Sequence, residues 1–352
     1  MLPIDRTLRP WALAIVVALG SLGGAASIAA DPVRIRVEPL TVPPATQPLI
    51  SVVVRNLQED PCTGTLSISG PADWRIAPDS QPLELAAGAE KRLAFNIEKA
   101  RNVEVNAYPF TIQARVGDRL VRCEQSVFVA SAPYSKATVD GRPDEWQDAI
   151  PVSFVQQGKR TTISTFWQRK RFCLLVAVQE QQHVGYAGAD GPPGDAVQLA
   201  ISSPEPPEAG GVQTARRIEF LLTSAGGVAK CFQLAAWDTP RARAGETQSL
   251  EPLECSDVET AIARDGEVTY YECSLPFSRL REAIEPAEGR EFFLSVLVHD
   301  PDGTGLRDLG RAAGLWTRPD DAQAWSRWRG MAAGSEPPLG NQVRWGLCTS
   351  KY

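Results

Sequence analysis

Apolar and polar residues alternate along most of the chain, and glycine and proline interrupt the alternation at short intervals. A period of two places every second side chain on the same face of a sheet, so the pattern predicts short β-strands. Helical periodicity is scarce, and the best helix candidate is the short segment Phe277–Ile284. We therefore expect an all-β protein that consists of two β-sandwich domains.

The first domain is expected at residues 33–132. Ile50, Val52 and Val54 share one strand face, and the same alternation recurs in the other apolar segments. About seven short strands in about 100 residues are typical of an immunoglobulin-like sandwich. The predicted strands are Arg34–Glu38, Leu49–Arg55, Thr65–Ser69, Pro82–Leu85, Arg92–Ile97, Phe110–Val116 and Leu120–Ala130.

A linker at residues 133–136, rich in small residues, leads to the second domain at residues 137–352. The segment Phe172–Val178 is apolar almost throughout, which predicts a central strand that is buried on both faces. The predicted strands are Thr161–Trp167, Phe172–Gln179, Ala196–Ile201, Arg217–Thr223, Val228–Ala236, Glu259–Arg264, Glu267–Leu275, Glu291–His299 and Asn341–Cys348.

Residues 1–30 have the features of a signal peptide. Arg6 and Arg9 precede the apolar run Trp11–Leu22, and the small residues Gly23–Ala30 follow it. The run is shorter than the roughly 20 residues that span a bilayer, so we expect cleavage between Ser27 and Ala30; an uncleaved anchor is the alternative. No second apolar run is long enough to span a membrane. The protein is therefore expected in the periplasm, at the cell surface or in the medium.

The net charge of −6 argues against a nucleic-acid partner, which would favour a basic face. All seven cysteines follow the signal peptide, and export permits disulfides. Cys62 and Cys123 are the two cysteines of the first domain, so we predict a disulfide between them; two buried thiols are the alternative. The sequence leaves open the pairing of Cys173, Cys231, Cys255, Cys273 and Cys348.

Four segments of the second domain, in order, resemble the family 9 carbohydrate-binding module. They are Val139–Trp146, Phe166–Trp167 with Phe172–Val178, Gly194–Leu199, and Tyr271–Leu280 with Val296–Asp300. The resemblance covers nearly all of residues 137–350, although Gln198 stands where the family has a glutamate. It implies a jelly-roll-type sandwich that binds polysaccharide or oligosaccharide and is often stiffened by calcium.

The first domain resembles the immunoglobulin-like domains of secreted bacterial glycosidases and surface proteins. The resemblance rests on Val52–Asn56, Gly70–Trp74 and Leu85–Gly88. It implies a spacer or platform rather than a chemical activity.

Saccharide sites combine aromatic faces, on which sugar rings stack, with planar polar side chains that bind the hydroxyls. A polar segment with three tryptophans predicts such contacts from Trp316, Arg318, Trp325 and Trp328, with Tyr186 as a further aromatic residue. The alternative is that these tryptophans cap the sandwich core.

A turn at Asp300 and Asp302 could hold a structural calcium ion, although no cofactor is required. The alternative is a turn in which aspartate binds its own backbone. The sequence shows no nucleophile motif with a partner histidine, and a glycosidase carboxylate pair is a tertiary feature.

We therefore expect an exported, non-catalytic carbohydrate-binding protein that is accessory to polysaccharide binding or breakdown. The alternative is a structural or interaction protein of the cell envelope whose sandwich has lost sugar binding. The oligomeric state is not determined by the sequence.

Overall fold

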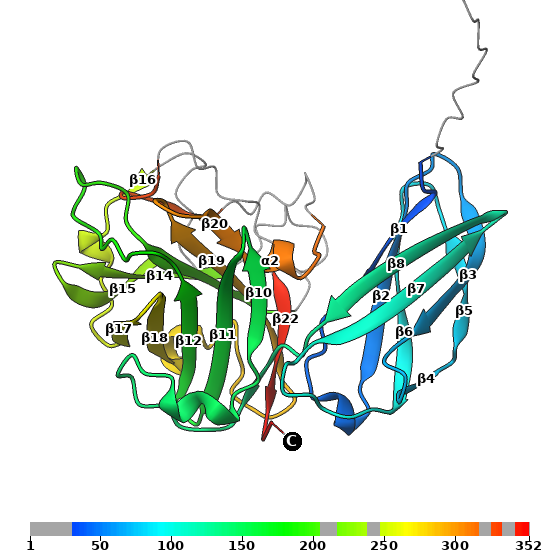
Figure 1. Cartoon of the computed structure of the whole chain (residues 1–352), viewed down its shortest axis with the longest axis horizontal. Coiled ribbons are helices and arrows are strands. Elements are labelled where there is room, and N and C mark those ends of the chain that lie inside the picture. The colour runs from blue at the N-terminus through cyan, green and yellow to red at the C-terminus, as the bar shows by residue number, and fades with distance from the viewer. Residues whose placement is uncertain (1–29, 205–216, 238–246, 317–324, 333–341, 352) are drawn as a thin grey trace, which may run out of the picture. The chain divides into compact units, whose positions relative to one another are not determined.

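The computed structural model describes residues 30–204, 217–237, 247–316, 325–332 and 342–351 (Figure 1). The first sandwich consists of two four-stranded antiparallel sheets. The first sheet has the order β1-β2-β6-β4, with the bounds Val33–Val37, Leu49–Asn56, Glu90–Lys99 and Arg75–Ala77. The second has the order β5-β3-β7-β8, with the bounds Ser80–Leu85, Cys62–Ser69, Tyr108–Val116 and Arg119–Val127.

The second sandwich consists of a five-stranded and a seven-stranded sheet (Figure 1). The five-stranded sheet has the order β10-β11-β12-β18-β17, with the bounds Val152–Gln156, Lys159–Gln168, Arg171–Gln179, Val268–Pro276 and Glu259–Asp265. The larger sheet has the order β15-β14-β13-β19-β22-β9, and β20 also pairs with β19. These strands are Val228–Ala235, Arg217–Ala225, Ala196–Ser202, Glu291–Asp300, Val343–Cys348, Ser131–Pro133 and Gly305–Asp308.

The remaining described elements are short. Strands β16 (Thr247–Gln248) and β21 (Arg327–Trp328) form a parallel pair. The helices are η1 (Pro44–Thr46), η2 (Asp144–Asp148), η3 (Glu251–Leu253), α1 (Phe277–Leu280) and α2 (Leu309–Ala312). The described part of the chain is thus dominated by strands, and the predicted all-β class is confirmed.

Period-two alternation produces both cores. In the first sandwich, the residues Ile50, Val52 and Val54 of β2 are buried in one apolar cluster with side chains from the opposite sheet. In the second sandwich, Leu199 of β13 and Leu174 of β12 meet in the larger cluster. Apolar side chains that leave water in this way provide the main driving force for the pairing of the two sheets.

Strand β12 is buried on both faces, as its continuous apolar sequence predicts. Leu174 faces the inner core, while Cys173 and Leu175 pack on the outer side with Trp146 and Phe166. The rings of Trp146 and Phe166 stack with centroids 4.7 Å apart. The opening segment of the second domain thus covers the five-stranded sheet.

Some elements differ from the predictions. The predicted helix Phe277–Ile284 is helical only at Phe277–Leu280, and a turn follows in which the N–H of Ala283 donates to the carbonyl of Leu280 (2.8 Å). Strands β4, β9, β10, β16, β20 and β21 have no predicted counterpart. Most are too short for alternation to distinguish them from turns.

The structure contradicts the predicted Cys62–Cys123 disulfide, and both residues are free thiols. Cys62 begins β3, whereas Cys123 lies two strands away in β8. Cys123 lies opposite Ile112, and Ile112 lies opposite Ile68, which is six residues along β3 from Cys62. Six residues extend about 20 Å along a strand, while a disulfide requires Cα atoms within about 7 Å.

The residues between the two sandwiches contact the second one. Strand β9 pairs in parallel with β22, Tyr134 forms a bridge with Trp167, and the Ser135 N–H donates to the Trp167 carbonyl (3.1 Å). By its contacts, Pro32–Tyr352 forms one unit, and the predicted domain bounds stay predictions. No helix among the described residues has the length and apolar character needed to cross a membrane.

Candidate functional site

The connection between β12 and β13 carries three potential metal ligands. Glu180 directly follows β12, Asp195 directly precedes β13, and His183 lies between them. Because β12 and β13 belong to different sheets, this connection passes from one sheet to the other. Backbone hydrogen bonds hold both ends, from the Glu180 N–H to the Glu267 carbonyl (2.9 Å) and from the Asp195 N–H to the Val184 carbonyl (2.7 Å).

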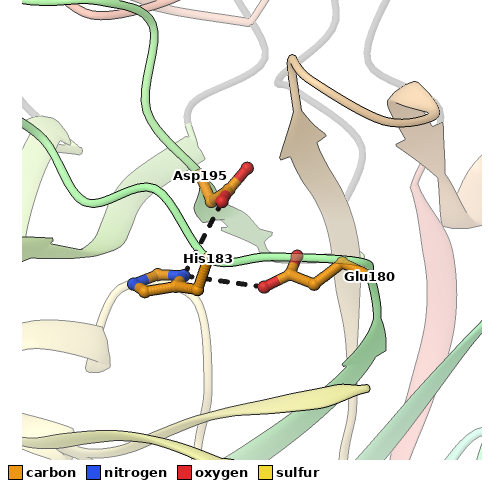
Figure 2. A group of neighbouring side chains, drawn as sticks. All are labelled: Glu180, His183 and Asp195. Carbon is orange, nitrogen blue, oxygen red and sulfur yellow. Dashed lines mark ion pairs between the residues drawn. The ribbon is translucent and has the colours of Figure 1, made fainter. Parts of the chain in front are cut away.

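The carboxylates of Glu180 and Asp195 point toward the imidazole of His183 (Figure 2). His183 Nδ1 lies 3.6 Å from Glu180 Oε1 and 3.8 Å from Asp195 Oδ2. Two other groups approach the site: Tyr271 Oη lies 3.2 Å from His183 Nδ1, and Arg264 Nη1 lies 3.6 Å from Glu180 Oε1. The Glu180 and Asp195 side chains are fully buried, so these groups are removed from water.

Several polar atoms of this group have no hydrogen-bond partner among the described residues: both carboxylate oxygens of Glu180, Asp195 Oδ1 and His183 Nε2. Asp195 Oδ2 does accept a hydrogen bond from the Val184 N–H. Burial, with a contribution from the charges of Glu180 and Asp302, raises the pKa of Asp195 to about 7, although the Val184 N–H and His183 act in the opposite direction. The three residues thus form a buried, acidic cluster with unused oxygens.

Replacing Asp195 with asparagine is expected to remove a pH-dependent loss of stability. Between pH 4 and pH 7 the folded protein keeps a proton on Asp195 that the unfolded chain has released, so stability falls as the pH rises through this range. Asparagine does not titrate and can still accept from the Val184 N–H. In chelator-treated buffer at pH 8, the variant should be more stable than the wild type by roughly 2–4 kcal/mol, and near pH 4 the difference should vanish.

Urea unfolding of both proteins at several pH values tests this prediction. Burial lowers the pKa of His299 to about 3, so this residue makes the free energy of unfolding rise with pH. The contribution is the same in both proteins and therefore cancels when their free energies of unfolding are subtracted. Asp302→Asn offers a comparison, because it removes one of the charges that raise the pKa of Asp195 and should reduce the pH dependence only in part. Equal pH slopes for the wild type and Asp195→Asn would contradict the prediction.

The predicted calcium turn lies at the end of β19. Asp300 is buried, and its Oδ2 accepts from the Thr304 N–H (2.9 Å), the Thr304 hydroxyl (2.8 Å) and the Arg307 guanidinium. Burial opposes its ionisation, but these hydrogen bonds and the Arg307 charge hold its pKa below the ordinary value. A Cβ at position 303 would lie 2.4 Å from Asp300 Oδ1, which explains the glycine there.

Asp302 is exposed, and its Oδ2 accepts a hydrogen bond from the Gln182 amide. Asp195, Asp300 and Asp302 together form a second group whose ligand atoms lie within 4.8 Å of one another. Asp300 also binds its own turn, as in the alternative interpretation. The structure thus places the two predicted ligands beside Asp195, which the sequence did not single out.

A second polar cluster lies on the outer face of the seven-stranded sheet. Arg217 and Glu219 of β14 form an ion pair of 2.6 Å in which both side chains are fully buried. Gln198 of β13 donates to Glu219 Oε2 (3.0 Å), the Ser326 N–H donates to the same oxygen (2.9 Å), and His299 Nε2 donates to Gln198 Oε1 (3.0 Å). A β-bulge between Glu219 and Phe220 interrupts the register at this point.

Two of the predicted saccharide-binding tryptophans, Trp325 and Trp328, lie over this outer face but do not face water. Trp325 is 2% exposed and Trp328 is 1% exposed. The Arg217 guanidinium lies 5.0 Å from the Trp325 ring centroid, and Trp328 packs edge-on against His299 (5.4 Å). Both rings cover polar side chains of the sheet and are themselves buried, so they are placed as in the alternative in which the tryptophans cap the sandwich, and the saccharide contacts stay a prediction.

Tyr186 is also buried and packs edge-on against Trp328, with ring centroids 6.2 Å apart. A Cβ at Gly330 would lie 2.6 Å from Trp328 and 2.8 Å from Tyr186, so this packing is tight. Trp316 is 9% exposed and lies apart from the cluster, with the guanidinium groups of Arg34 and Arg36 over its ring. Arg318 lies outside the described residues.

Sequence reasoning missed the charged residues of both clusters. Glu219 stands at a polar position of the alternating strand Arg217–Thr223, where such a residue is normally assigned to solvent. Glu180 and Asp195 flank two predicted strands, so acidic residues at strand ends are a signal in the sequence. Their convergence depends on which ends of the two sheets meet, and that is a tertiary property.

Comparisons with known proteins assign no family. No family model matches the chain, and no curated protein matches it. Among solved structures, a family 9 carbohydrate-binding module from Caldicellulosiruptor kristjanssonii in complex with glucose aligns at 10% identity and a TM-score of 0.35, over 62% of this chain and 94% of that chain.

A family 9 carbohydrate-binding module from the same organism in complex with cellotriose aligns at 10% identity and a TM-score of 0.36, over 62% of this chain and 93% of that chain. The E. coli chaperone DraB aligns at 10% identity and a TM-score of 0.22, over 60% of this chain and 93% of that chain. At these scores the alignments assign no function, and what the structure itself establishes is an all-β protein with two sandwiches and two buried polar clusters.

Proposed function

We propose that residues 137–352 form a non-catalytic carbohydrate-binding module of an exported protein. The observation that supports this proposal most is the outer-face cluster of Gln198, Arg217 and Glu219 with two indole N–H groups beside it. Trp325 Nε1 and Trp328 Nε1 are buried and have no hydrogen-bond partner among the described residues. Buried donors normally find an acceptor, and a sugar hydroxyl would supply one to each indole.

The chemistry of the cluster fits a saccharide. Guanidinium, carboxylate and amide groups are planar hydrogen-bonding partners for hydroxyls, and they lie next to large aromatic surfaces. Because Trp325 and Trp328 are covered, a sugar must shift them to enter. Part of the interaction energy is consumed in this step, so we expect modest affinity for a single sugar unit.

Trp325→Phe and Trp328→Phe test the proposal, because each removes an indole N–H and keeps an aromatic ring. Isothermal titration with soluble oligosaccharides and pull-down on insoluble polysaccharides should show binding by the wild type. Each variant should weaken it by about tenfold, the equivalent of about 1.4 kcal/mol for one hydrogen bond.

Trp146→Phe is the matched control. Its indole Nε1 already donates to Glu272 Oε1 (3.0 Å) on the five-stranded sheet. This variant should lose stability and keep saccharide binding. Equal binding by all three variants would place the saccharide elsewhere, and no binding of any glycan by the wild type would contradict the proposal.

A structural calcium ion remains a secondary proposal. Asp195, Asp300 and Asp302 offer an oxygen-only set of the kind calcium prefers. Their number is smaller than the six to eight oxygens that calcium takes, and Asp300 Oδ2 is already engaged. Backbone carbonyls and water would have to complete the shell.

Export and the accessory role in polysaccharide breakdown are proposals from the sequence of residues 1–30 and from the family resemblance. The mass of the mature protein, recovered from an expressing bacterium, tests cleavage between Ser27 and Ala30. The immunoglobulin-like first domain would serve as a spacer.

The alternative function is a structural or interaction protein of the cell envelope. The burial of Trp316, Trp325 and Trp328 favours it, since open stacking surfaces are the usual sign of a working glycan site. The titrations above separate the two functions, because the alternative requires a folded protein that binds no glycan.

A further inference from the structure

The acidic cluster between β12 and β13 is short of positive charge. Glu180 has two buried oxygens without hydrogen bonds, and its described ion-pair partners are His183 and Arg264. The Arg264 guanidinium is committed elsewhere: it donates to the carbonyls of Glu180 and Gln181 and to the Thr269 hydroxyl. Buried carboxylates are normally hydrogen-bonded, paired with cations or bound to metals.

From these contacts we propose that Glu180, His183 and Asp195 bind a divalent transition-metal cation of the zinc type. The Glu180 oxygen and the Asp195 oxygen lie 3.6 Å and 3.8 Å from His183 Nδ1. Ligands of one tetrahedral zinc ion, each about 2.0–2.2 Å from the metal, are about 3.3–3.6 Å apart. Contraction by a few tenths of an ångström would bring each carboxylate oxygen to such a distance from His183 Nδ1, and the three ligand atoms all lie within 4.8 Å of one another.

The nitrogen ligand decides the class of cation. Calcium and magnesium take oxygen ligands, whereas imidazole suits zinc and neighbouring transition metals. This site is therefore distinct in chemistry from the oxygen-only group of Asp195, Asp300 and Asp302, although Asp195 belongs to both.

The surroundings can support such a site. The Val184 N–H binds Asp195 Oδ2 and orients that carboxylate, as outer-shell donors do in metal sites. Tyr271 Oη lies 3.2 Å from His183 Nδ1, but a hydroxyl proton can rotate away, so this contact leaves the nitrogen accessible to a cation. A bound ion would join the end of β12 to the start of β13, three residues before Gln198.

Isothermal titration calorimetry of the chelator-treated full chain, with Zn²⁺ and separately with Ca²⁺ as the titrant, tests the inference. We expect one zinc equivalent to bind at least about tenfold more tightly than calcium. Glu180→Gln and His183→Gln should each weaken zinc binding by about 10–100-fold or more. Both variants should fold as well as the wild type without metal, because neither removes a hydrogen bond to a buried carboxylate oxygen.

Asp302→Asn is the matched control and should leave zinc binding unchanged. The cysteine thiols are a competing zinc site, so zinc binding that survives both Glu180→Gln and His183→Gln overturns the inference. Absence of zinc binding also overturns it, as does a preference for calcium that Asp302→Asn abolishes. Because glycan titrations use different variants, failure here is distinguishable from failure of the carbohydrate proposal.

Discussion

Replacing Glu219 with alanine is expected to lower the free energy of unfolding of the second sandwich by about 3–5 kcal/mol. Both partners of the Arg217–Glu219 ion pair are fully buried. The substitution removes the carboxylate that pairs with the Arg217 guanidinium in a site that water does not reach. It also removes the acceptor for the Gln198 amide and for the Ser326 N–H.

Urea unfolding followed by tryptophan fluorescence measures this loss, since most tryptophans belong to the second sandwich. Glu254→Ala is the matched control, because the Lys230–Glu254 pair is also short (2.7 Å) but both side chains are about a third or more exposed. Exposed pairs of this kind contribute about 0–1 kcal/mol. Similar losses in the two variants would mean that Glu219 is hydrated and that the cluster is open to water.

Replacing Arg307 with alanine is expected to have an effect of the same size, about 3–5 kcal/mol. Arg307 is fully buried and pairs with Asp300. Its guanidinium also donates to the carbonyls of Gln179 (2.8 Å) and Arg160 (3.3 Å), which belong to the opposite sheet. The alanine variant therefore loses a link between the two sheets and leaves Asp300 as an unpaired buried carboxylate.

The pH dependence of the Arg307 variant provides a further check. Because the pKa of Asp300 is lowered in the folded protein, its ionised form contributes stability above the ordinary aspartate pKa, and this contribution is lost as the pH falls. The difference in the free energy of unfolding between the wild type and Arg307→Ala should therefore become smaller below about pH 4.

Arg344→Ala is the control for this variant, since the Arg344–Glu291 pair is about one-third exposed on both sides. It should lower the free energy of unfolding by less than about 1 kcal/mol. Arg307→Lys should recover only part of the loss, because an ammonium group cannot reproduce the fork of hydrogen bonds. If the free energies of unfolding of the wild type and Arg307→Ala differ by a constant amount from pH 3 to pH 8, the unpaired charge of Asp300 is not the cause of the lost stability.

The position of the tryptophans predicted to bind saccharide is related to the same buried charges. Trp325 and Trp328 stand in a polar segment of the sequence, which normally indicates exposure. In the structure they pack over Arg217, Glu219 and His299, a polar layer that alternation alone would assign to solvent. Whether a sheet face is covered depends on segments that are distant in the sequence. The local pattern of apolar and polar residues therefore does not show that this face is buried.

The all-β class and the inward face of most long strands follow from the pattern of residues alone. The reason is physical: a strand with one buried face must place an apolar residue at every second position, so Ile50, Val52 and Val54, or Phe292 and Leu294, reveal that face without knowledge of the partner strand. The failed disulfide shows the limit of such local reasoning, because the distance between Cys62 and Cys123 depends on the order of strands in a sheet.

Which polar residues meet depends on how the two sheets pack together. Glu180 directly follows a strand of one sheet, and Asp195 directly precedes a strand of the other. Gln198, Glu219 and Ser326 converge from three separate segments. Each of these residues resembles an ordinary surface residue when read along the chain. Their burial, and the electrostatic free energy that it imposes, arises only when the sheets and the covering segment close around them.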